Sequence, residues 1–116
     1  GFYRVMAKIS SHTLNGFDGT HAEGITVQLR NTKNGSVIFS VEMDAGGRLF
    51  QEVSAHHIEP DVSYELIFDT GTYWAKRSID AKTKEIALRF EMHDPDGVYH
   101  MPIIINPNAY STWISS

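Results

Sequence analysis

The chain has 116 residues and carries 10 Lys and Arg against 14 Asp and Glu, so its formal charge is −4 with histidine neutral. That length and an apolar share of 41% suit one hydrophobic core, and we expect a single domain over residues 1–116. The mild acidity argues against nucleic acid or a membrane surface as a partner, because both attract basic proteins. Without cysteine, the chain has no disulfide framework, no thiolate nucleophile and no cysteine-based zinc site.

The beginning of the chain does not decide the compartment. It has neither an initiator methionine nor the apolar stretch of a signal peptide. An upstream segment that has been removed is compatible with this start, so a cytoplasmic and a periplasmic location both stay open. No apolar run in the sequence approaches the roughly 20 residues that a membrane-spanning helix needs.

Short runs of β-branched and aromatic residues, separated by turn residues, dominate the sequence. In the first run, Val5, Ala7 and Ile9 fall on one face of a strand. His12 falls on the opposite face, which we expect to point to solvent, a partner or a cavity. We expect eight strands, at residues 3–14, 24–31, 37–43, 48–53, 62–68, 85–93, 98–106 and 109–115.

Three local signals refine this pattern. The pair Asn34-Gly35 lies between two strand-like runs and predicts a type I′ hairpin turn. Residues 72–81 contain good helix formers, and we expect one short helix there, with Thr70 or Thr72 as its N-cap. Pro102 cannot donate to a strand ladder and favours an edge or a bulge. Together the signals indicate an all-β fold, an antiparallel sandwich of about eight strands with one short helix.

The six histidines are the main candidates for chemistry. His12 and His100 lie opposite candidate core faces, a position that on composition alone is typical of surface or interface histidines. We expect structural roles for the other four, His21, His56, His57 and His93, whose spacing matches no zinc signature. The neighbouring Ser10 and Ser11 are not expected to form a nucleophilic pair with His12, because a strand does not give that geometry.

The order of several short motifs along the chain is more informative about the family than any single residue. They run Ser11-His12-Thr13-Leu14-Asn15, Ala22-Glu23-Gly24-Ile25, Gly47-Arg48, Phe68-Asp69-Thr70 with Tyr73-Trp74, Tyr99-His100-Met101-Pro102 and Tyr110-Ser111-Thr112. This order resembles the transthyretin superfamily over nearly the whole chain, and specifically its 5-hydroxyisourate hydrolase branch. That branch is distinguished by a histidine on the first strand, a Gly-Arg after the third and a Tyr-His-x-Pro on the seventh. His12, Arg48 and His100 match these positions.

The end of the chain departs from the pattern of that branch. The enzymes usually close with Tyr-Arg-Gly-Ser, whose residues help line the active site, whereas this chain closes with Trp113-Ile114-Ser115-Ser116. Trp113 keeps the aromatic bulk without the hydroxyl, and Ile114 removes a cation. Ser116 matches the terminal serine by position.

The resemblance implies an assembly and a reaction. It implies a transthyretin-like fold in a homotetramer, a dimer of dimers whose central channel holds the sites. The implied reaction is hydrolysis of 5-hydroxyisourate, a small urate-derived molecule, to 2-oxo-4-hydroxy-4-carboxy-5-ureidoimidazoline in purine catabolism. No cofactor and no metal are implied. The alternative is a non-catalytic tetramer that binds an aromatic or apolar ligand in its channel, and a third reading is a sandwich without a ligand.

The resemblance also implies roles for individual residues. His12 and His100 would activate water and move protons, since an imidazole changes its charge near neutral pH. Arg48 would hold the urate-like anion through its planar guanidinium. We expect further substrate contacts from the residues near the end of the chain, namely Ser111, Trp113 and Ser116.

Overall fold

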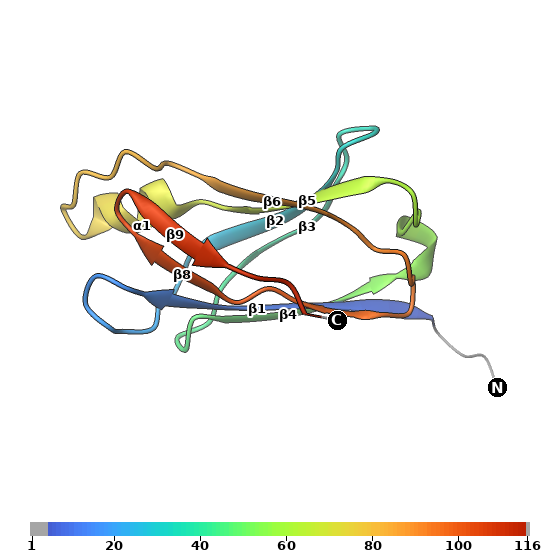
Figure 1. The fold of residues 1–116 in the computed structure, drawn as a ribbon, viewed down its shortest axis with the longest axis horizontal. Helices are drawn as coiled ribbons and strands as arrows, with labels where there is room; N and C mark the ends of the chain where they lie inside the picture. Colours follow the sequence, from blue (N-terminus) through green and yellow to red (C-terminus); the bar gives the residue numbers. More distant parts are fainter. Residues whose placement is uncertain (1–4, 116) are drawn as a thin grey trace.

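The computed structural model describes residues 5–115, which form two facing β-sheets with one short α-helix beside them (Figure 1). One sheet has the strand order β4-β1-β8-β9, with β7 also paired to β1, and the other has the order β3-β2-β5-β6. The elements are β1 (Met6–Asn15), β2 (Thr26–Asn31), β3 (Val37–Glu42), β4 (Arg48–Ser54), the 3₁₀ turn η1 (Ala55–His57), β5 (Ser63–Phe68), α1 (Thr70–Lys76), β6 (Ile86–Glu91), β7 (Val98–His100), β8 (Ile103–Asn106) and β9 (Ala109–Thr112). The expected all-β sandwich is confirmed, with nine strands over the described residues in place of about eight.

The hydrophobic core lies between the two sheets and follows from the alternation along each strand. In β1 every second side chain is buried, and Ala7 and Ile9 are both fully buried, as the alternation predicts. Full burial of an aliphatic side chain such as that of Ile9 contributes about 1.5–3 kcal/mol. The prediction is wrong for Val5, which is 46% exposed because it precedes the first residue of β1.

The predicted strand over residues 98–106 is two strands, because Pro102 interrupts it. Met101 still donates its N–H to the carbonyl of Ser10 at 2.9 Å, but Pro102 has no N–H to continue the ladder. β7 and β8 each pair with β1 in the parallel direction, so this sheet is mixed rather than wholly antiparallel. The parallel pairing matters for the site, since it brings His100 beside Ser10.

The helix occurs where it was expected but begins and ends earlier. It spans Thr70–Lys76, and Asp69 is the N-cap rather than Thr70 or Thr72, since its carboxylate accepts the N–H of Thr72 at 3.2 Å. Ser78 has a positive φ of 57° and ends the helix, with the N–H of Ile79 reaching the carbonyl of Trp74 at 3.0 Å. Within residues 5–115, no helix has the length and apolar character that would let it cross a membrane.

The connection between β2 and β3 lies at the predicted place but is not a type I′ turn. Gly35 has φ 75°, whereas Asn34 does not adopt the positive φ that such a turn needs at both central residues. The side chain of Asn31 holds the connection instead, since its Oδ1 accepts the N–H of Lys33 at 2.8 Å. The N–H of Gly35 reaches the carbonyl of Asn31 at 2.9 Å and closes the turn.

Candidate functional site

Polar side chains of three adjacent strands gather on the outer face of the first sheet. The pairing of β1 with β4 sets His12 opposite Arg48 and Ser10 opposite Phe50. The pairing of β1 with β7 sets Ser10 opposite His100. All five residues lie on the face away from the core, since their neighbours along each strand are the buried ones. The structure therefore brings His12, Arg48 and His100, predicted from separate parts of the sequence, to one surface.

A tight turn before β4 positions Arg48. Gly47 has φ 69°, and a Cβ at this position would lie 2.5 Å from the carbonyl oxygen of Thr13. The side chain of Asp44 accepts the backbone N–H groups of Gly46 and Arg48 at 3.0 and 2.8 Å. Gly47 thus serves backbone geometry and lets the turn approach β1 closely.

His100 forms a hydrogen bond that the sequence analysis did not anticipate. Its Nδ1 lies 2.7 Å from Oγ of Ser10, although residues ninety positions apart in the chain carry the two groups. The histidine partner of Ser10 comes from the neighbouring strand β7 and not from β1. Ser11 points inward, where its Oγ donates to the carbonyl of Met101 at 2.7 Å. Since Nδ1 of His100 is engaged, proton exchange with a bound ligand would use its Nε2.

A second histidine lies against His12, and sequence reasoning gave it only a structural role. Nε2 of His12 is 3.0 Å from Nδ1 of His21, and the two ring centroids are 5.1 Å apart with an angle of 25° between the ring planes. The segment after β1 turns back, so that His21 pairs with Leu14 in an isolated bridge. The signal that could have found His21 is the turn at Asn15-Gly16 and Gly19, which folds residue 21 back beside residue 12.

The surroundings of His12 lower its pKa below the ordinary value of 6.5. Burial is the largest cause, because it disfavours the charged imidazolium, and the positive charge of Arg48 and then that of His21 act in the same direction. A backbone hydrogen bond at Gly46 opposes these effects, and His100 adds a smaller lowering. The His12 imidazole therefore stays neutral, and able to accept a proton, down to a lower pH than an ordinary histidine does.

A shallow cavity of about 360 Å³ opens on the same face. It combines a cation, a hydroxyl, an imidazole and an exposed aromatic ring, since Phe50 is 59% exposed. Its lining residues are Ser10, Ser11, Asp44, Arg48, Leu49, Phe50 and His100. His12 lies beside the cavity, opposite Arg48 across the strand pair. Such a hollow can bind a small polar ring and exchange protons with it.

The other predicted site residues lie apart from this cavity. Ser111 is in β9, on the far side of β8 from β1, where it pairs with Ile104. Trp113 is 55% exposed and lines an apolar hollow of about 100 Å³ together with Phe90 and Ile114. Within one chain, the structure therefore does not bring Ser111 or Trp113 to the His12 and Arg48 face.

The chain nevertheless returns to the site strand just before its end. The N–H of Ser115 donates to the carbonyl of His100 at 2.9 Å, and the N–H of His100 donates to the carbonyl of Ser115 at 2.9 Å. This pair of hydrogen bonds fixes the backbone of His100 from the side opposite to β1. Ser116, the remaining predicted contact, lies outside the described residues.

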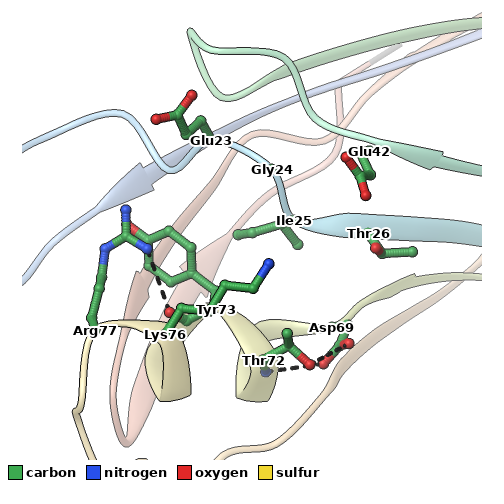
Figure 2. Close-up of a pocket in the computed structure, with 10 residues that line it drawn as sticks. All are labelled: Glu23, Gly24, Ile25, Thr26, Glu42, Asp69, Thr72, Tyr73, Lys76 and Arg77. Carbon is green, nitrogen blue, oxygen red and sulfur yellow. Dashed lines mark hydrogen bonds between the residues drawn. The ribbon is translucent and has the colours of Figure 1, made fainter.

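A further cavity, of about 90 Å³, lies between the start of β2 and α1 (Figure 2). Figure 2 shows charged side chains of both signs around it, with the Arg77 guanidinium over the ring of Tyr73 at 3.7 Å from the ring centroid. The residues that Figure 2 draws include no histidine. Among the described residues, no group of three His, Asp or Glu side chains is placed to hold a metal ion.

The fold and the outer-face site together define a class. The class is a transthyretin-like β-sandwich whose sheet surface carries a guanidinium and imidazoles, side chains with the chemistry to bind an anion and to transfer protons. The chain belongs to the HIUase/Transthyretin family, whose model matches residues 9–114. The family match confirms the resemblance to the transthyretin superfamily that the order of the sequence motifs indicated.

Individual relatives extend this result over nearly the whole length of the chain. The chain is 29% identical to the 5-hydroxyisourate hydrolase of Pseudomonas aeruginosa over 118 residues, which cover 96% of this chain and 93% of that protein. It is similar to the structure of the Klebsiella pneumoniae 5-hydroxyisourate hydrolase, with a TM-score of 0.79, 29% identity and coverage of 94% and 99%. Transthyretin from Sparus aurata has the same fold, with a TM-score of 0.79, 23% identity and coverage of 93% and 97%.

Proposed function

We propose that the protein hydrolyses 5-hydroxyisourate to 2-oxo-4-hydroxy-4-carboxy-5-ureidoimidazoline, a step of urate degradation. The observation that carries the proposal is the meeting of His12, Arg48 and His100 on one outer face. The Pseudomonas aeruginosa and Klebsiella pneumoniae relatives, both 5-hydroxyisourate hydrolases by name, support the same reaction. The chain acts as one domain over residues 1–116.

The reaction opens a cyclic amide and needs a base and an acid. Water attacks the amide carbonyl and gives up a proton, the carbon–nitrogen bond breaks, and the leaving nitrogen takes a proton. His12 suits the part of the base, because its lowered pKa keeps the ring neutral to a lower pH than that of an ordinary histidine. His100 suits proton transfer through Nε2, because Ser10 engages its Nδ1 and fixes the direction of the ring. No metal or cofactor takes part in this scheme.

Arg48 supplies the positive charge of the site. A guanidinium donates two parallel hydrogen bonds to a pair of oxygens, a geometry that a lysine does not offer. Two such bonds would hold the urate-like ring over the cavity beside Phe50. The same charge would stabilise the oxyanion that forms when water attacks, an effect worth about 3–4 kcal/mol per donor in other enzymes.

We further propose that the protein is a homotetramer arranged as a dimer of dimers. Large apolar side chains are exposed on the described surface, and a subunit interface would cover them. The exposed side chains that support this arrangement are Phe50, Val98, Tyr110, Trp113 and Ile114. In a tetramer, Ser111, Trp113 and Ser116 of one subunit would complete the substrate site of another.

The test is the ultraviolet decay of freshly prepared 5-hydroxyisourate with and without the protein. We expect micromolar protein to accelerate the decay, and His100→Asn to slow the catalysed rate by about 10²–10⁴-fold, the usual contribution of an acid–base group. His93→Asn is the matched control, since the side chain of His93 is 79% exposed, follows β6 and does not line the cavity. An unaccelerated decay, together with indifference to His100→Asn, would remove the proposal.

The alternative, a tetramer that only binds an aromatic or apolar ligand, has the apolar hollow at Trp113 in its favour. That hollow lies beside Phe90 of the second sheet and not beside His12 and Arg48. Calorimetry with thyronine-like aromatics against urate analogues separates the two functions. Binding of the aromatics alone would favour the alternative, and binding of the urate analogues would favour the hydrolase.

A further inference from the structure

We propose that His21 is a positioning residue for His12: its imidazole orients the His12 ring and shares a single proton with it through the contact between Nε2 and Nδ1. The inference rests on the proposed function for the part that His12 plays as a base. Within residues 5–115, the hydrogen bond of the His21 side chain goes to His12 and not to Arg48 or His100, so its effect on the reaction would pass through His12.

The distance between the two nitrogens requires one hydrogen between them. Nε2 of His12 and Nδ1 of His21 are 3.0 Å apart, which is a hydrogen-bond distance. Two lone pairs, or two N–H groups, would repel each other at this distance. The contact is therefore compatible with a neutral pair and with a pair that carries one extra proton. A pair with both rings fully protonated would have to separate.

Backbone hydrogen bonds on both sides of His21 hold it against β1. The N–H of Ala22 donates to the carbonyl of Thr13 at 3.0 Å, and the N–H of Asn15 donates to the carbonyl of Thr20 at 2.8 Å. The bridge between Leu14 and His21 is antiparallel, which places the His21 side chain diagonal to that of His12 on the same face. Backbone hydrogen bonds therefore fix the position of His21 beside His12.

The charges that face His12 favour one proton on the pair rather than two. The groups that act on its ring come from three other segments: Arg48 in β4, His100 in β7 and His21 in the returning segment. Each of them is a cation or becomes one on protonation, and the backbone at Gly46 supplies the opposing effect. A second proton on the His12 and His21 pair would therefore add to an already positive environment.

The test is an NMR titration of the histidine ring protons of the full-length protein, with the His12 signal assigned by its loss in His12→Asn. We expect the His12 midpoint in the unaltered protein to lie below 6.5. In His21→Ala the midpoint should rise, because the variant removes both the neighbouring charge and part of the burial. In His21→Asn the side-chain amide can still donate to Nε2 of His12, so the ring orientation is kept while the shared proton is lost.

The pH profile of hydrolysis provides the second measurement. In His21→Ala, kcat/KM at pH 5.5 should fall by about 2–5-fold while the value at pH 8 changes little, because the acid limb moves to higher pH. His21→Asn should keep the rate at pH 8 and still shift the acid limb, and His93→Asn should change neither. A His12 midpoint and an acid limb that are both unmoved in His21→Ala would overturn the proposal.

The two readouts separate this inference from the function on which it rests. A protein without hydrolase activity whose His12 midpoint still moves in His21→Ala would overturn the proposed function and leave the shared proton supported. An active protein whose His12 midpoint does not move would leave the hydrolase in place and overturn the role of His21.

Discussion

The His12 imidazole lies among groups that are positively charged or become so on protonation. Burial and the Arg48 guanidinium both lower its pKa from 6.5, and His21 and His100 act in the same direction. In the folded protein the ring therefore binds its proton only at a pH below the value at which the unfolded chain would bind it. At neutral pH the result is a neutral imidazole beside a permanent cation, which is the arrangement that an acid–base site for an anionic substrate needs.

At the residue scale, we predict that Arg48→Met raises the pKa of His12. The variant keeps much of the length of the side chain and removes its charge, so the second largest cause of the lowering disappears while burial stays. Titration of the His12 ring signal by NMR measures the effect. Arg30→Met is the control, because Arg30 is exposed on β2 of the other sheet. A His12 midpoint that falls, or one that moves equally in both variants, would contradict the account.

At the scale of the elements, a cap and a turn set where the short helix α1 begins and ends. The side chain of Asp69 begins α1, and the turn at Ser78 ends it through the hydrogen bond between Ile79 and Trp74. Ser78 adopts φ 57°, a conformation that glycine takes more easily than any other residue. The short helix is thus held by its ends and by burial of Trp74, which is fully inaccessible to solvent.

We therefore predict that Ser78→Gly stabilises the protein by about 0.5–1 kcal/mol, because glycine removes the steric cost of the left-handed conformation. Urea unfolding at equal protein concentrations measures the change in the free energy of unfolding. Ser40→Gly is the matched control: Ser40 is an exposed residue within β3, where glycine should be destabilising. Destabilisation by Ser78→Gly would show that its positive φ is not a source of strain.

The elements also show which parts of the structure a single sequence predicts. The alternation of Ala7 and Ile9 against His12 is a local property, so the burial of β1 and the outward direction of His12 could be predicted. The parallel pairing of β7 with β1 is not local, so nothing in the sequence placed Ser10 beside His100. The pair of His12 and His21 was missed for a similar reason, because a return of the chain after Gly19 creates it.

At the scale of the whole molecule, both sheets enclose the core, and one of them also carries the candidate site. The two sheets face each other (Figure 1). The sheet of β3, β2, β5 and β6 buries one face against the core, and the sheet that contains β1 and β4 does the same and carries the site on its outer face. The residue trio was recognised from the order of its motifs, and the family match over residues 9–114 supports that recognition. The contacts expected of Ser111 and Trp113 lie elsewhere on one chain, which makes the site dependent on assembly in our proposal.

The central claim is that His12 and His100 act as one unit beside Arg48. The most direct measurement is kcat/KM for 5-hydroxyisourate in His12→Asn, in His100→Asn and in the protein that carries both substitutions. When two groups act as one unit, removing either of them abolishes nearly all of their joint contribution to catalysis. We therefore predict that kcat/KM of the double variant is no more than about threefold lower than that of the slower single variant. Losses that multiply in the double variant, or full activity in either single variant, would contradict the account.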